Sequence, residues 1–64
     1  MKTILVNIQN EEVTIFNEKK QTWETCNFYE AGIHNKPYDK DEIEAHLIER
    51  ESYYTDEEIK VIFE

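Results

Sequence analysis

One cysteine and two histidines are the side chains of this sequence with the most reactive chemistry. Cys26 with His34 or His46 would supply the thiol and the base of a nucleophilic site. Such a site also needs a neighbour that lowers the thiol pKa and a glycine-rich turn that stabilises an oxyanion, and the chain contains a single glycine. We therefore expect Cys26 to be a packing residue, which at most cross-links two copies under oxidising conditions.

The histidines and carboxylates do not have the spacing of a metal site. No CxxC or HxxxH pair is present. Glu42 and His46 lie one helical turn apart, and we expect them to form a hydrogen-bonded pair that supports a helix. Asp39 and Asp41 begin like a calcium loop, but the glycine and the glutamate that this loop requires further on are missing. The sequence predicts no metal and no cofactor.

The many carboxylates do not by themselves indicate acid–base catalysis. A catalytic pair must lie in a cleft that shifts its pKa values, and 64 residues leave little room for a cleft. A glycine-rich phosphate loop cannot be built with one glycine. We expect a protein that is not an enzyme.

Negative charge is the strongest signal in the composition. Seven basic and fifteen acidic residues give a net charge of −8. Residues 1–38 hold five acidic and four basic residues, whereas residues 39–64 hold ten acidic and three basic ones. Nucleic acid and anionic membrane surfaces would be repelled, so we expect neither as a direct partner. A basic surface of another protein is the complementary expectation.

The length of the chain predicts one domain, residues 1–64. No apolar run reaches the roughly 20 residues that span a bilayer, and no signal-peptide pattern is visible. A single cysteine suits a reducing compartment. The expected location is therefore the cytoplasm, of a host cell if the protein is phage-encoded.

The clearest structural instruction is a helix start at Asp39. Its side chain can cap the first turn, Glu42 three residues on can complete a capping box, and Tyr38 with Ile43 can close a hydrophobic staple. We expect a helix over residues 40–51 with Ile43 on its buried face. Ile48 lies well off that face, and it is expected either to contact a second helix or to be exposed.

The same pattern returns at Thr55, with Glu58 as the reach-back residue and Tyr54 as a staple. It predicts a second helix over residues 56–63. The alternation of Ile59, Val61 and Phe63 makes a strand over residues 58–64 the competing interpretation. The capping pattern favours the helix.

The N-terminal half has the alternation of strands. Residues 3–8 and 13–16 are expected to form a hairpin around a turn at residues 9–12, with Asn10 best suited to positive φ. Residues 21–30 fit a third strand, and a helix over residues 18–31 is the alternative. The predicted fold is therefore α+β: an N-terminal antiparallel β-hairpin or three-stranded meander followed by two short α-helices packed on one face.

The function we expect is that of a small acidic non-enzymatic binding protein. It would inhibit by occupying a basic, nucleic-acid-binding surface of a partner protein, as a nucleic-acid mimic. A high share of Lys, Asn, Ile, Glu and Tyr is typical of AT-rich genomes, and small phage inhibitors of host defence, such as anti-CRISPR proteins, have this size and charge. The predicted partner-binding residues are acidic side chains of both helices with one exposed tyrosine: Asp39, Asp41, Glu42, Glu44, Glu49, Glu51, Tyr53, Asp56, Glu57 and Glu58.

An apolar-interface module, either a homodimer or a subunit of a larger assembly, is the alternative function. Ile48 and Tyr53 as exposed contacts and the edges of a small sheet favour it. Its binding would survive high salt, whereas binding through the acidic surface would not. A weaker third possibility is a regulator that binds a small ligand through His34, Trp23 and Tyr29.

Overall fold

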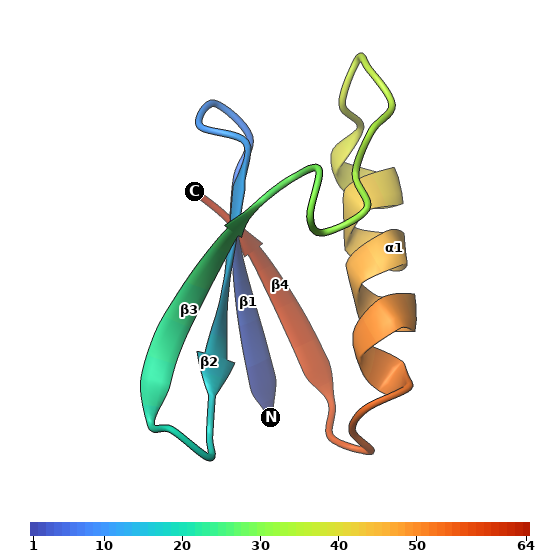
Figure 1. The fold of residues 1–64 in the computed structure, drawn as a ribbon. Coiled ribbons are helices and arrows are strands. Elements are labelled where there is room, and N and C mark those ends of the chain that lie inside the picture. The colour runs from blue at the N-terminus through green and yellow to red at the C-terminus, as the bar shows by residue number, and fades with distance from the viewer.

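A four-stranded mixed sheet with one helix forms the fold. The computed structural model describes all residues from 1 to 64. Its elements are β1 (Lys2–Asn7), β2 (Glu12–Asn17), β3 (Thr22–Asn27), α1 (Lys40–Ser52) and β4 (Ile59–Phe63). The strand order is β3-β2-β1-β4, in which β1 pairs antiparallel with β2 and parallel with β4 (Figure 1). The predicted α+β class is confirmed, whereas the predicted arrangement is correct only in part.

The expected N-terminal strands are present. β1, β2 and β3 form consecutive antiparallel pairs, so residues 22–27 are a strand and not part of a helix. The predicted meander is not the complete sheet, however, because the sheet continues beyond β1 into β4.

The predicted second helix over residues 56–63 is wrong. Residues 59–63 form β4, which runs parallel to β1 in a register that pairs Lys2 with Ile59 and Val6 with Phe63. The capping chemistry of Thr55 is nevertheless used, since its Oγ1 accepts the backbone N–H of Glu57 at 3.1 Å. The capping signal therefore closes a turn before a strand. The free edge of β1, which lies far away in the sequence, decides between the two conformations.

Three asparagines spaced ten residues apart close the turns after the first three strands. The Oδ1 atoms of Asn7, Asn17 and Asn27 each accept the backbone N–H three residues further on, at 2.9, 3.1 and 2.8 Å respectively. Such bonds let an asparagine side chain stand in for a backbone acceptor. The spacing of ten sets the equal strand lengths of the meander.

Positive φ in these turns falls on residues that the sequence does not single out. Glu11 has φ of 55° and Gln21 has φ of 56°, directly before β2 and β3. The expectation that Asn10 would take this conformation is wrong, because the left-handed residue that turns the chain into β2 is Glu11. Gly32 ends the third turn with φ of 84°, where a side chain is strained.

The helix begins where the sequence predicts. Asp39 has an extended backbone, and its Oδ1 accepts the N–H groups of Asp41 at 2.8 Å and Glu42 at 3.3 Å. Glu42 makes no return bond to Asp39, so the capping box is half formed. The helix ends at Ser52, one residue beyond the predicted end. It is neither long enough nor apolar enough to cross a membrane.

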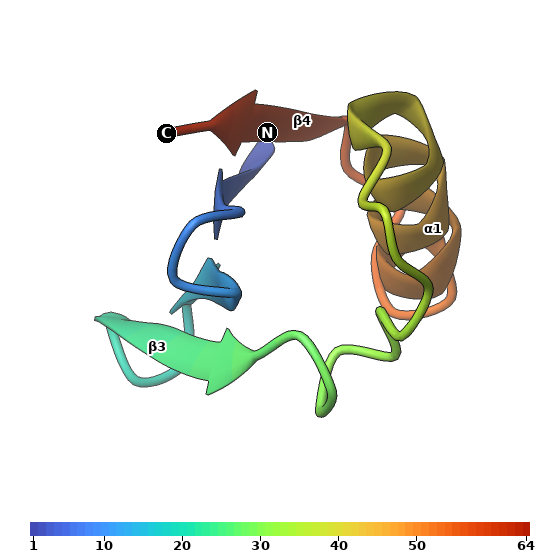
Figure 2. The same ribbon diagram turned by 90° about the horizontal axis from the view of Figure 1, so that it is seen from above.

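The core lies between α1 and the concave face of the curved sheet. Viewed from above, the four strands curl around one side and α1 closes the other (Figure 2). The buried residues are all apolar: Ile4, Val6, Val13, Phe28, Ala31, Ile33, Ile43 and Leu47. The predicted inward face of the helix is therefore confirmed, and Ile48 is 37% exposed because there is no second helix to cover it.

We predict that Asp39→Ala lowers the free energy of unfolding by about 1 kcal/mol, because the first turn of α1 loses its cap. Urea unfolding followed by circular dichroism measures this loss. Asp39→Asn keeps an acceptor oxygen at the same place and should retain most of the stability. Equal losses in both variants would show that the charge of Asp39 matters and its hydrogen bonds do not.

A second prediction compares two aliphatic residues of α1. Leu47→Ala should cost about 2–5 kcal/mol, because Leu47 is 1% exposed and its removal leaves a cavity in the core. Ile48→Ala should cost less than about 1 kcal/mol, since that side chain already contacts water. The same urea measurement compares the two, and similar losses would contradict the placement of the core.

Candidate partner-binding site

Three carboxylates occupy the solvent-facing side of α1. Asp41, Glu42 and Glu49 are exposed, and none of them lies within an ion pair. At 100° per residue they fall within one sector of the helix, with the small side chain of Ala45 between them. Glu42 and Glu49 are two turns apart, about 10 Å along the axis. We call Asp41, Glu42 and Glu49 the acidic helix face.

Four other predicted acidic residues are bound within the chain or partly buried. Glu51 Oε2 lies 3.5 Å from Lys2 Nζ, and its side chain is only 12% exposed. Glu57 Oε1 accepts a hydrogen bond from the amino group of Met1 at 3.2 Å. Asp39 caps α1, and Glu44 is half-buried. The structure therefore does not gather the predicted residues into one surface.

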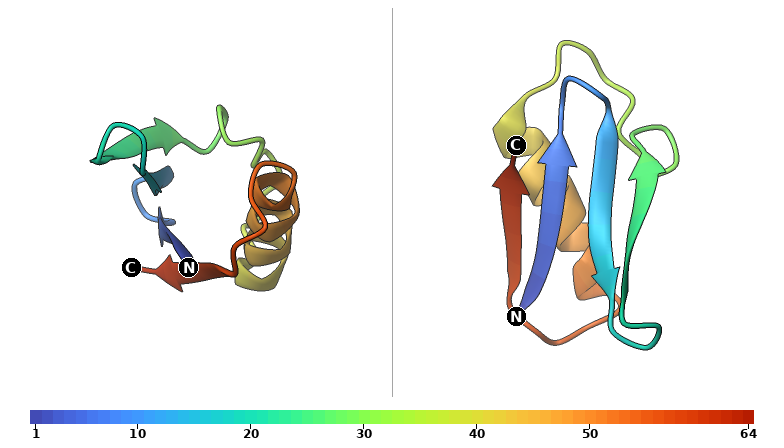
Figure 3. Two further views of the ribbon diagram at one scale, coloured as in Figure 1. Left: turned by 90° about the horizontal axis from the view of Figure 1, so that it is seen from below. Right: turned by 90° about the vertical axis from the view of Figure 1, so that its left-hand side faces the viewer.

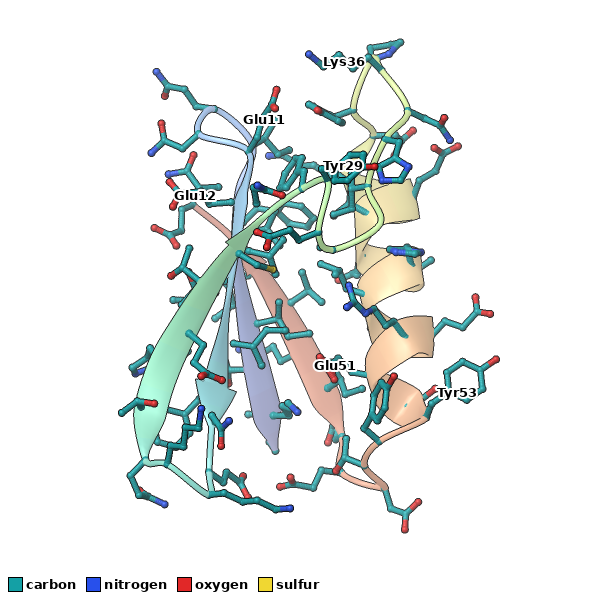
Figure 4. The ribbon with its side chains drawn as sticks, in the orientation of Figure 1. Glu11, Glu12, Tyr29, Lys36, Glu51 and Tyr53 are labelled. Atoms are coloured by element: carbon teal, nitrogen blue, oxygen red, sulfur yellow. The ribbon has the colours of Figure 1, made fainter.

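Glu51 and Tyr53 are close in sequence but point in opposite directions. Glu51 is directed toward the sheet, whereas Tyr53 projects away from it at the end of α1 (Figure 4). Tyr53 is 78% exposed, as the sequence predicts. Tyr54 is also exposed and has no staple role, because the helix that it was expected to cap is absent. Asp56 and Glu58 are exposed in the loop before β4.

The basic residues of α1 do not compensate the acidic helix face. Arg50 Nη1 donates to the backbone oxygen of Glu30, with 3.5 Å between the two atoms. Lys40 Nζ lies 5.6 Å from the centre of the Phe63 ring. Both cations are thus directed toward other parts of the chain, and the acidic helix face remains without a positive partner.

The histidines contact backbone oxygens. His46 Nε2 is hydrogen-bonded to the oxygen of Ala31 at 3.0 Å, so the expected Glu42–His46 pair does not form. His34 stacks on Tyr29, with 4.9 Å between ring centres, and bonds the Tyr29 oxygen. A hollow of about 120 Å³ lies between the two histidines at the start of α1. No three His, Cys, Asp or Glu side chains are grouped as a metal ion would require.

A larger groove of about 520 Å³ separates the ends of β2 and β3 from the end of α1. Glu24 lies in its wall, and its pKa is lowered by a hydrogen bond from Asn17 at 2.9 Å and by the charge of Lys20. Cys26 and Tyr54 line it as well. Sequence reasoning missed this groove. Its only sequence signal is that Glu24 occupies an inward position of β3, where β1 and β2 carry isoleucine and valine.

The convex face of the sheet is not covered by any other element (right-hand view of Figure 3). Trp23 and Phe16 lie opposite each other on β3 and β2, with 5.2 Å between ring centres. Leu5 and Ile62 lie opposite each other on β1 and β4. Trp23 is 52% exposed and Ile62 is 38% exposed. This convex face therefore carries two exposed apolar side chains, Trp23 and Ile62.

Comparisons with protein families, with curated proteins and with solved structures find no match for this chain.

The pKa of the Cys26 thiol can be tested by chemical modification. Burial raises the pKa of its thiol, and the negative charge of Glu30 raises that pKa further. The rate of alkylation by iodoacetamide should therefore rise at higher pH than for an unstructured cysteine peptide. Glu30→Gln should move the midpoint of this profile down, because the charge is lost while the acceptor for the Asn27 N–H remains. Glu12→Gln is the control, and an equal shift in both variants would contradict the assignment.

Proposed function

We propose that this chain is a non-enzymatic binding protein whose acidic helix face engages a basic surface of another protein. The observation that carries the proposal is the set of exposed carboxylates on α1 without any cationic partner. Like charges on one helix face reduce the stability of a small domain. A basic partner would remove that repulsion on binding.

The arrangement suits inhibition of a protein that binds nucleic acid. The net charge of −8 attracts a positively charged groove over a distance of about a Debye length, roughly 8 Å at physiological ionic strength. α1 is about 20 Å long and presents its carboxylates from a rigid element. Bound in such a groove, it would exclude phosphates from the same cations. A phage inhibitor of a host defence nuclease, including the anti-CRISPR kind, belongs to this class of function.

The convex face supports a second candidate function, that of an apolar-interface module. Its exposed Trp23 and Ile62 offer apolar contact area, and tryptophan is enriched among the residues that dominate binding energies. A partner held there would be retained at high salt. This response separates the two candidates.

A triple variant tests the acidic helix face. Asp41→Asn, Glu42→Gln and Glu49→Gln together remove three charges and keep the side-chain shapes. Partners are captured from a low-GC bacterial lysate on immobilised protein, washed at low and then high salt, and quantified by mass spectrometry. We expect wild type to retain a nucleic-acid-binding protein at low salt. The variant should bind that protein more weakly, by about tenfold or more.

The matched control removes three charges elsewhere, through Glu12→Gln, Glu18→Gln and Glu30→Gln. It has the same net charge as the helix variant, so it should bind almost as well as wild type. Glu51 is left unchanged, because its loss would leave Lys2 without its ion-pair partner. Equal capture by both triple variants and by wild type would overturn the proposal, and a partner retained at high salt would favour the apolar module.

A further inference from the structure

The outer edge of β4 has backbone groups without partners. Lys2 N–H donates to the Glu58 oxygen at 2.8 Å, and Glu64 N–H donates to the Val6 oxygen at 2.8 Å. Because the backbone groups of a strand alternate in direction, the N–H and C=O groups of the even-numbered residues of β4 point toward β1. The N–H and C=O groups of Ile59, Val61 and Phe63 therefore point outward, and β4 lies at the edge of the sheet (right-hand view of Figure 3).

The charges along this edge are arranged for a copy of the same strand. Lys60, Ile62 and Glu64 share the convex side of β4, with a cation at one end and an anion at the other. No ion pair within the chain involves Lys60 or Glu64. A strand with one lysine usually discourages edge pairing. Here an antiparallel copy can bring a carboxylate opposite each lysine.

We propose that two copies of this chain associate by antiparallel pairing of their β4 edges, with Ile62 on the two-fold axis. In this register Lys60 of each copy lies opposite Glu64 of the other, and Val61 exchanges its backbone hydrogen bonds with Phe63 of the other copy. The two sheets become one continuous sheet, and all outward-facing groups of Val61 and Phe63 are satisfied.

Neighbouring registers are less favourable. With Val61 on the axis, Glu58 faces Glu64 of the other copy, and with Lys60 on the axis the two lysines face each other. With Ile59 on the axis, Glu58 faces Lys60, but Glu57 is then placed opposite Val61. Glu57 is already bound to the amino group of Met1.

The other edge of the sheet offers no such complementarity. β3 carries a single charge, Glu24, and its carboxylate is already held by Asn17 and Lys20. Antiparallel pairing of two β3 strands would therefore form no ion pair. The β4 edge is therefore better suited to pairing of two copies than the β3 edge.

Salt separates this association from the proposed function, on which it does not depend. Two chains of charge −8 repel each other over long distances, and screening reduces that repulsion. The dimer should therefore form more readily as salt rises. Binding of a basic partner by the acidic helix face should weaken under the same conditions.

Charge exchange at β4 tests the pairing by sedimentation velocity of the full chain over a range of concentrations. Lys60→Glu should weaken the dimer by about tenfold or more, because two carboxylates then face each other at each end. Glu64→Lys should weaken it as much, although this variant has less net charge. The double variant K60E/E64K should restore it. Glu58→Lys changes the charge in the same way outside the paired residues, and it should leave the dimer intact.

A covalent test fixes the register. In a Cys26→Ala background, Ile62→Cys should form a disulfide across the axis on oxidation, since opposing residues there are about 4.5 Å apart at Cα. Lys60→Cys should not cross-link. The proposal is overturned by a wild-type monomer at about millimolar concentration and high salt, by failure of K60E/E64K to rescue, or by cross-linking of Lys60→Cys in place of Ile62→Cys. Dimer loss in Glu58→Lys would likewise overturn it.

Discussion

Packing of α1 over the concave face of the sheet, with β4 as its nearest strand, is the interaction on which the remaining structure depends. Ile43 and Leu47 supply the contacts from the helix, and Ile4, Val6 and Val13 supply those from the sheet. No polar side chain is buried with them. Since β3 and β4 lie at opposite edges of the sheet, the chain must cross one face of the sheet to reach β4, and the loop after β3 together with α1 crosses the concave face. The loop after β3, with buried Phe28, Ala31 and Ile33, and α1 therefore complete both the core and the connection.

Local sequence signals predict those parts of the fold that local interactions determine. Asp39 starts the helix because its side chain reaches two N–H groups in its own turn. The meander follows from alternating apolar residues and short polar turns. The spacing of Asn7, Asn17 and Asn27 was a further signal of this kind, and it would have settled the status of residues 21–30.

β4 shows where local signals stop being sufficient. Thr55 carries the same capping pattern in a helix and in the turn that precedes this strand, so the pattern cannot distinguish them. The decision depends on a vacant edge of β1 and on the inward side chains Ile59, Val61 and Phe63. Such pairing between distant segments is not encoded in any short stretch of sequence.

The candidate site, too, is predictable from the sequence only in part. The sequence predicts the excess of acidic residues on the C-terminal half, because composition is sufficient for that. It does not show which carboxylates are free. Glu49 and Glu51 are two residues apart, yet one faces water and the other is paired with Lys2 at the start of β1. To distinguish the two residues, one must know which way each side chain points from the helix and which residue of a distant strand lies beside it.

The parallel pairing of β1 with β4 also affects the order of events during translation. β1 lies inside the sheet, although its residues are synthesised well before those of its neighbour β4. Until then β1 has only β2 as a neighbour, and the apolar residues Ile4 and Val6 lack their helix. The nascent chain therefore carries an exposed central strand until α1 and β4 have been synthesised. Chaperone contact or premature aggregation would act on that strand, the part of the finished molecule that is best protected.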